Sequence, residues 1–217
     1  MVIEPSVADR IPVPKRLGSK IVVLIDPFRR REIYAESGLE SKHVTSFIAR
    51  SDVIAIHEQF LVSYTRDGTT HIHYVDAVVD FADGKRIAHF IKYAAEAHKV
   101  ALEDLVRMIA ATGDHKFDEY RVLTEFDISP TTIANAELIV RCGRNFDIDA
   151  IDLVRNHLRS APPVVTPRTI AGQTELGSRG SDALIAMLQS EDVSLVRPYS
   201  TITPDTRFNN FIGRRPS

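Results

Sequence analysis

Cysteine is almost missing from this sequence. Cys142 is the single cysteine among 217 residues, which excludes an intramolecular disulfide and a zinc site built from cysteines. A reducing compartment suits such a chain, and we expect a cytoplasmic protein. No apolar run approaches the length of a membrane span, and the first residues lack the charged and apolar regions of a signal peptide. We therefore expect no membrane partner.

A large excess of positive charge is missing too. The formal net charge of −2 argues against a protein that coats nucleic acid over its whole surface. Basic residues nevertheless outnumber acidic ones in residues 1–34 and 197–217, which are either phosphate-binding patches or solvated tails. The chain also has no phosphate-cradling glycine loop and no serine-nucleophile elbow, so we expect no small-molecule cofactor.

Apolar runs and turn residues predict an α/β fold with a central mixed sheet flanked by helices. The composition, with 44% hydrophobic and 26% charged residues, is that of an ordinary globular protein. Asp-Gly pairs at residues 67–68 and 83–84 mark tight turns between three antiparallel strands. These strands are expected at residues 53–64, 70–81 and 86–93, and a short buried strand at 120–124. Helices are expected at residues 38–49, 99–111, 131–141 and 148–159.

A second, smaller domain is expected at the C-terminal end. Two consecutive prolines, Pro162 and Pro163, punctuate the chain after the last long helix. The residues that follow predict a helix near Thr169, a helix at 182–189 and a strand at 193–197. Because helix, helix and short strand in this order are typical of a small winged-helix domain, we expect domains at residues 1–148 and 149–217.

One carboxylate lies where a solvent-facing group is not expected. Glu40 falls near the centre of the apolar face of the helix at residues 38–49, between Val44, Phe47 and Ile48. Burial of a carboxylate is costly unless the group is paired, neutralised or bound to a metal. This position therefore indicates a functional carboxylate.

Asp76 and Lys92 lie on neighbouring predicted strands and can converge on one face of the sheet. A metal-dependent nuclease needs carboxylates that hold Mg²⁺ and a lysine near the attacking water. An aspartate followed on the next strand by a lysine is the skeleton of the PD-(D/E)XK nucleases. The alternative is a surface ion pair on a hairpin.

An ordered series of short motifs resembles the TnsA-type endonucleases, the nuclease subunits of heteromeric cut-and-paste transposases. The series covers roughly residues 30–145. Its members are Tyr34-Ala-Glu-Ser-Gly-Leu-Glu40, Ile56-His-Glu-Gln-Phe60, His73-Tyr-Val-Asp-Ala-Val-Val-Asp80, Phe90-Ile-Lys92, and Val122-Leu-Thr-Glu125 with Asn135.

The resemblance implies a restriction-endonuclease-like fold and a role for each matched residue. Glu40 and Asp76 would bind Mg²⁺ or Mn²⁺, and Lys92 would be the catalytic lysine. The family cuts double-stranded DNA at transposon ends beside an integrase-type transposase subunit. Its small C-terminal domain contacts that partner and DNA.

One position departs from the family pattern. The family has Gln or Glu two residues before the lysine, and this chain has Phe90, which strand alternation places on the same face as Lys92. A phenyl ring cannot bind Mg²⁺, so Glu96 is a candidate for a displaced ligand. The alternative function is an impaired or inactive TnsA-like subunit that binds DNA or the transposase. A regulatory module without nuclease ancestry would require the motif series to be accidental.

Overall fold

A four-stranded mixed sheet forms the centre of the N-terminal part of the chain. The computed structural model describes residues 2–12, 21–97, 100–112, 117–145 and 147–213. The sheet consists, in spatial order, of β3 (Val53–Arg66), β4 (Thr69–Phe81), β5 (Arg86–Ile91) and β6 (Glu119–Leu123). The first three strands are antiparallel and β6 runs parallel to β5. This confirms the α/β fold with a central mixed sheet, an architecture compatible with a nuclease-like fold.

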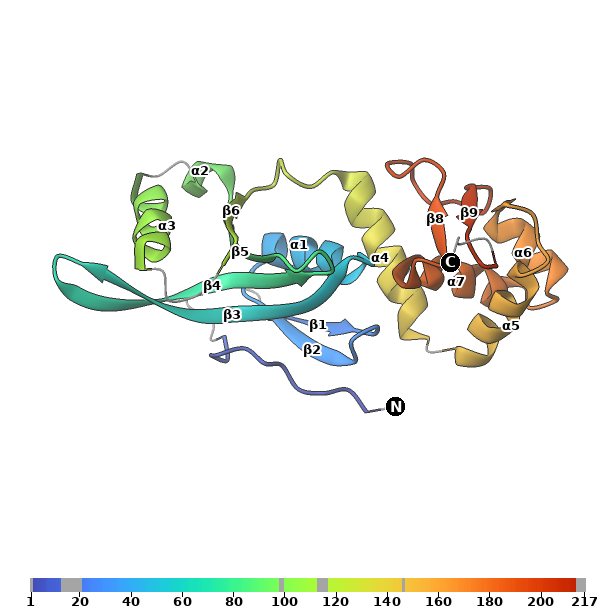
Figure 1. Ribbon diagram of the computed structural model, residues 1–217, viewed down its shortest axis with the longest axis horizontal. Coiled ribbons are helices and arrows are strands. Elements are labelled where there is room, and N and C mark those ends of the chain that lie inside the picture. Colours follow the sequence, from blue (N-terminus) through green and yellow to red (C-terminus); the bar gives the residue numbers. More distant parts are fainter. Residues whose placement is uncertain (1, 13–20, 98–99, 113–116, 146, 214–217) are drawn as a thin grey trace. The chain divides into compact units, whose positions relative to one another are not determined.

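The Asp-Gly turns are where the sequence predicts them. Asp67 and Gly68 both have positive φ, 51° and 73°, and join β3 to β4 as a two-residue loop. Gly84, with a φ of 86°, lies in the turn between β4 and β5. Figure 1 shows β3 and β4 as one long hairpin whose tip extends beyond β5. Local turn chemistry thus sets the order of the first three strands.

The ladder between β3 and β4 is interrupted at Gln59 and Asp76. The register passes from Glu58 opposite Ala77 to Phe60 opposite Val75, and Gln59 between them has a φ of 49°. A glutamine adopts this left-handed conformation only where the surrounding structure imposes it.

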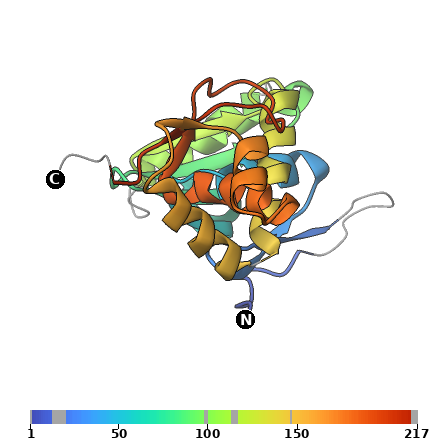
Figure 2. The same ribbon diagram turned by 90° about the vertical axis from the view of Figure 1, so that its right-hand side faces the viewer.

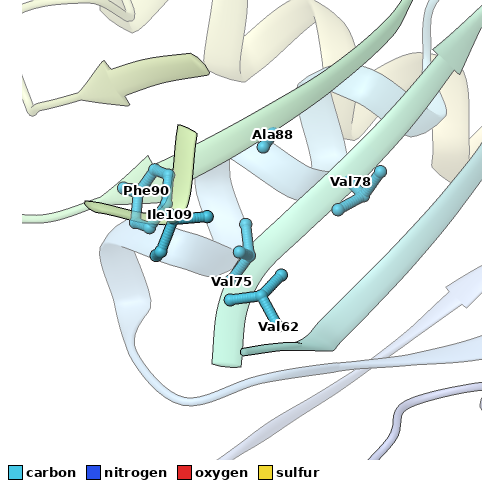
Figure 3. Packing of buried hydrophobic residues seen from close by; sticks show 6 residues of the cluster. All are labelled: Val62, Val75, Val78, Ala88, Phe90 and Ile109. Carbon is cyan, nitrogen blue, oxygen red and sulfur yellow. The ribbon is translucent and has the colours of Figure 1, made fainter. Parts of the chain in front are cut away.

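Side-chain alternation along β4 breaks at the same place. Val75 and Val78 are three residues apart, so a regular strand would turn them to opposite faces of the sheet. Both instead belong to one buried cluster with Phe90 and Ile109 (Figure 3). Asp76 lies within this break. Its side chain is therefore not part of the apolar cluster that contains Val75 and Val78.

Helices and a small hairpin flank the sheet. The hairpin is β1 (Val22–Asp26) and β2 (Arg31–Ala35), and the helices are α1 (Gly38–Ile48), α2 (Ala94–Ala97) and α3 (Val100–Thr112). Helix α1 packs against β5 through Phe47, whose ring lies 4.7 Å from the His89 ring. Helix α3 contributes Ile109 to the buried cluster. Strand β2 was not predicted from the sequence, and residue 99 of the expected helix at 99–111 lies outside the described residues.

The C-terminal part has its own helices and a three-stranded sheet, shown in yellow to red in Figure 2. Its helices are α4 (Pro130–Arg144), α5 (Ile148–Leu158), α6 (Pro167–Gln173), α7 (Ser178–Ala186) and the 3-10 helix η1 (Met187–Ser190). Its strands β7 (Val164–Val165), β8 (Val193–Leu195) and β9 (Phe208–Asn210) form an antiparallel sheet in the order β7-β9-β8. The sequence therefore predicted the helices here better than the strands.

The chain divides into two units, residues 1–48 with 52–129 and residues 49–51 with 130–217. The expected boundary between residues 148 and 149 lies further along the chain than this division, because α4 packs with α7 in the second unit. Within the described part of the chain, no helix is both long and apolar enough to cross a membrane. Parts of the two basic segments, residues 13–20 and 214–217, lie outside the described residues.

Candidate functional site

Asp76 and Lys92 form a hydrogen-bonded ion pair. The Nζ atom of Lys92 lies 2.9 Å from Oδ2 and 3.1 Å from Oδ1 of Asp76, whose side chain is almost fully buried. The backbone N–H of Ile91 also donates to Asp76 Oδ2, at 2.7 Å. Lys92 follows directly after β5, and its own N–H donates to the carbonyl of Leu123 in β6, at 2.9 Å. The break in β4 and the end of β5 thus place the two side chains together.

Glu40 lies in the first turn of α1 and is buried. Its Oε2 accepts a hydrogen bond from the N–H of Glu36 at 2.8 Å, and its Oε1 accepts one from the Ser37 hydroxyl at 3.2 Å. The N–H of Glu40 in turn donates to Ser37 Oγ at 3.1 Å. These reciprocal bonds resemble a capping box, which stabilises the start of a helix. They orient the carboxylate but do not neutralise its charge.

The three predicted residues share one electrostatic environment. Burial and, after it, the negative charge of Asp76 raise the pKa of Glu40, while Lys92 acts in the opposite direction, and together these effects bring the pKa from 4.5 to about 7. For Lys92, burial alone would lower the pKa, but Asp76, Glu40 and Glu36 together hold it above its ordinary value. The structure therefore brings Glu40, Asp76 and Lys92 to one place.

Glu36 is a fourth member of this group that the sequence analysis did not single out. Its carboxylate acts on Lys92 and forms an ion pair with Arg10, whose Nη2 lies 2.8 Å from Glu36 Oε1. The available signal was its place directly before Ser37 in the motif that ends at Glu40. A loop carboxylate just before a helix has no periodicity that would mark it as inward-facing, so the pattern could not distinguish it from a solvated residue.

Neither Phe90 nor Glu96 belongs to this charged group. The Phe90 side chain is fully buried and stacks on His73, with ring centroids 5.8 Å apart. Glu96 lies in α2 and is exposed. Strand alternation does not predict the surroundings of Phe90, because Lys92 lies beyond the last residue of β5. Glu36 joins Asp76 and Glu40 as a carboxylate whose charge acts on Lys92.

The donor set suits a hydrated hard cation. Among the residues that the structure describes, no three His, Cys, Asp or Glu side chains are grouped so as to hold a metal ion. Mg²⁺ is commonly bound by one or two carboxylates and keeps several waters, so Glu40 and Asp76 fit it as a pair. The raised pKa of the buried Glu40 supports this fit, because a cation would offset the repulsion between Glu40 and Asp76. In the present arrangement the ammonium of Lys92 is the cation that contacts Asp76.

Comparisons with protein-family models and with curated proteins find no match to this chain. The interpretation of the site therefore depends on its own geometry and charge. Two buried carboxylates with a lysine hydrogen-bonded to one of them can bind a divalent cation, orient a water molecule and stabilise negative charge on a phosphate.

The raised pKa of Glu40 predicts how stability depends on pH in the metal-free protein. A carboxyl with a higher pKa in the folded than in the unfolded state binds more protons when folded, so its contribution to stability falls as pH rises from about 4.5 to about 7. We expect Glu40→Gln to be as stable as the wild type near pH 4.5 and to gain up to roughly 3 kcal/mol relative to it above pH 7.

Urea denaturation in EDTA at a series of pH values measures this difference. Glu103→Gln, on the exposed surface of α3, is the matched control and should show a constant difference. A Glu40→Gln difference that is independent of pH would show that Glu40 is ionised without penalty and is not part of a buried acidic pair.

Proposed function

We propose that this protein is a Mg²⁺-dependent DNA endonuclease of a heteromeric transposition system that cuts phosphodiester bonds at element ends. The observation that carries the proposal is the convergence of Glu40, Asp76 and Lys92, three residues from separate parts of the chain, in one buried charged group. The ordered motif series that resembles the TnsA-type family supports it, because that family's helix carboxylate, strand carboxylate and lysine correspond to these positions.

Each residue has a distinct chemical role in this proposal. Glu40 and Asp76 would hold Mg²⁺, which would stabilise the negative charge that develops on the phosphate. Lys92 orients the attacking water and compensates phosphate charge through its ammonium. Lys92 contacts both oxygens of Asp76, so Mg²⁺ held by Asp76 would share this carboxylate with the ammonium.

We also propose that the C-terminal unit is a winged-helix-like domain. The succession of helix α5, strand β7, helices α6 and α7 and strands β8 and β9, with a small three-stranded sheet, supports this proposal. We infer a module that contacts an integrase-type transposase subunit and DNA. Helix α7 buries residues 183–186, so the exposed Arg197 and Arg207 of the β8–β9 connection are better placed than α7 to meet phosphates.

The alternative is a TnsA-like subunit with little or no activity that binds DNA or the transposase. Two features favour this alternative. Lys92 occupies both carboxylate oxygens of Asp76, and no third metal-ligating side chain joins the pair among the described residues. Measurements of cation binding and of DNA cleavage distinguish the nuclease from the inactive subunit.

Cleavage of supercoiled plasmid DNA tests the proposed function. We expect nicking or linearisation in Mg²⁺ or Mn²⁺, complete loss in EDTA, and loss of at least about 100-fold in rate for Asp76→Asn, which removes a metal-binding charge. Calorimetric titration with Mn²⁺ should detect binding to the wild type and not to Asp76→Asn.

The control is Asp104→Asn, which alters an exposed carboxylate of α3 and should cut like the wild type. If the wild type binds Mn²⁺ but does not cut DNA by itself, the result supports a nuclease that depends on its partner. A folded wild type that neither binds Mn²⁺ nor cuts contradicts the proposal and leaves the inactive subunit.

A further inference from the structure

The N-terminal segment, residues 2–12, lies against β3 beside the candidate site. The Ser6 hydroxyl donates to the buried carboxylate of Glu58, and the N–H of Leu61 donates to Asp9 Oδ2 at 2.7 Å. These bonds lie on either side of Gln59, the residue at which the β3–β4 ladder is interrupted. The segment therefore carries Arg10 to that interruption.

Arg10 connects Gln59 to Glu36. Its Nε and Nη2 donate to Gln59 Oε1 at 2.9 and 2.6 Å, and Nη2 also donates to Glu36 Oε1 at 2.8 Å. The guanidinium lies over the Tyr74 ring, 4.4 Å from its centroid. These hydrogen bonds involve only Nε and Nη2 of Arg10. The third nitrogen, Nη1, makes no hydrogen bond with any residue that the structure describes. A guanidinium held on one side in this way keeps donors for a planar or tetrahedral anion.

Gln59 has a buried donor without a partner. Its side chain is fully buried, and its Nε2 makes no hydrogen bond to the described residues. Leaving a buried N–H unpaired costs on the order of 1–3 kcal/mol, so such groups usually have a partner in the functional state. The left-handed backbone at Gln59 adds strain, which is typically retained at ligand-binding positions.

The pair formed by Arg10 and Gln59 borders the charged group of the candidate site. Gln59 and Asp76 are both skipped where the register of β3 and β4 passes from Glu58–Ala77 to Phe60–Val75. Glu36, which Arg10 binds, is also one of the carboxylates that act on Lys92. Donor groups beside a metal-binding pair of carboxylates are placed to hold a phosphate whose bond is to be cut.

We propose that Arg10 and Gln59 form a phosphate-binding site for the DNA backbone, in which Gln59 Nε2 and the Arg10 guanidinium donate to phosphate oxygens and the phosphate replaces the Glu36 carboxylate on Arg10. The inference deepens the proposed function, on which it rests for the identity of the ligand. Glu36 has the charge of a phosphate oxygen and occupies one of the donors that the phosphate takes. Arg10 and Gln59 are positioning residues, because they hold the backbone and leave the chemistry to the metal and Lys92.

Two substitutions test the site by different routes. Arg10→Ala removes the cation, whereas Gln59→Glu keeps the oxygen that accepts from Arg10 and removes the unpaired donor. Because the acceptor remains, Gln59→Glu is expected to fold, and its thermal unfolding temperature verifies this. Arg107→Ala is the matched control, since Arg107 is an exposed arginine of α3 that pairs only with Glu103 and Asp104 among the described residues.

Fluorescence anisotropy with a short fluorescein-labelled duplex in EDTA measures binding without cleavage or metal. We expect the Kd to rise about tenfold for Arg10→Ala and for Gln59→Glu, the effect of one lost charge-assisted contact, and to stay unchanged for Arg107→Ala. Across a salt series, the slope of log K against log salt should fall by about one for Arg10→Ala, as for one lost phosphate contact.

Folded Arg10→Ala and Gln59→Glu proteins that bind the duplex like the wild type would overturn this inference, and so would a wild type that does not bind it. The fate of the proposed function is separate. A wild type that binds DNA through both residues but never cuts it in Mg²⁺ retains the phosphate site and loses the nuclease. If the wild type cuts DNA and both variants cut and bind it equally well, the proposed nuclease function stands and the proposed phosphate site is rejected.

Discussion

Substitution of Lys92 by methionine is expected to reduce DNA cleavage by at least about 100-fold. Methionine keeps most of the length and apolar stem of lysine and removes the ammonium that hydrogen-bonds to Asp76 and carries positive charge toward a phosphate. Loss of one preorganised electrostatic group typically costs a factor of about 10²–10³ in rate. The measurement is the initial rate of plasmid cleavage in Mg²⁺.

The same variant distinguishes a catalytic from a metal-binding role of the lysine. Because the ammonium no longer competes for Asp76, Lys92→Met should bind Mn²⁺ at least as tightly as the wild type in a calorimetric titration. Lys85→Met is the matched control, since Lys85 is a half-exposed lysine on the same hairpin that pairs with Glu119. A folded Lys92→Met protein that cuts at the wild-type rate would remove Lys92 from the mechanism.

Substitution of Phe90 by alanine is expected to destabilise the protein by about 3–5 kcal/mol. The ring is fully buried in the cluster with Val62, Val75 and Ile109, as Figure 3 shows, and truncation leaves a cavity there. A total stability of roughly 5–15 kcal/mol makes this a large fraction of the whole. Urea denaturation measures the change, and Phe126→Ala, at an 81% exposed residue, should change stability by less than about 0.5 kcal/mol.

Phe90→Glu decides whether this position is a lost metal ligand. Its carboxylate would replace the ring inside the apolar cluster, so we expect a larger loss of stability than for Phe90→Ala and no gain in Mn²⁺ affinity. A Phe90→Glu protein that is as stable as the wild type and binds Mn²⁺ more tightly would contradict this placement. It would show that residue 90 shares a face with Lys92, as strand alternation predicts.

Much of the fold of the first unit follows from local patterns. Asp67-Gly68 adopts the positive φ angles that a two-residue hairpin requires, and the helix at residues 38–49 follows from its apolar spacing. Strand β2 was missed because Arg31–Ala35 is short, begins with charged residues and owes its conformation to pairing with β1. The winged-helix order and the DNA and transposase partners stay predictions.

The candidate site shows where such patterns stop. Glu40 could be picked out because its neighbours on the helix face are apolar. A charged residue on an apolar face is recognisable from the sequence alone. Asp76 and Lys92 could be named from the motif order. The surroundings of Phe90 could not, because the break in alternation at Asp76 has no sequence signature and the core around Ile109 is assembled from distant segments.

The sequence by itself determined the turns and the helices, because each depends on neighbours within a few positions, and the order of its motifs pointed to Asp76 and Lys92 beside Glu40. Tertiary structure alone decided that Gln59 adopts a left-handed conformation, that Arg10 reaches it from the N-terminal segment and that Glu36 acts on Lys92. Contacts between residues about 50 or more positions apart depend on how strands pair and where a ladder is interrupted. Those contacts set the burial and the charge of the site, and with them its chemistry.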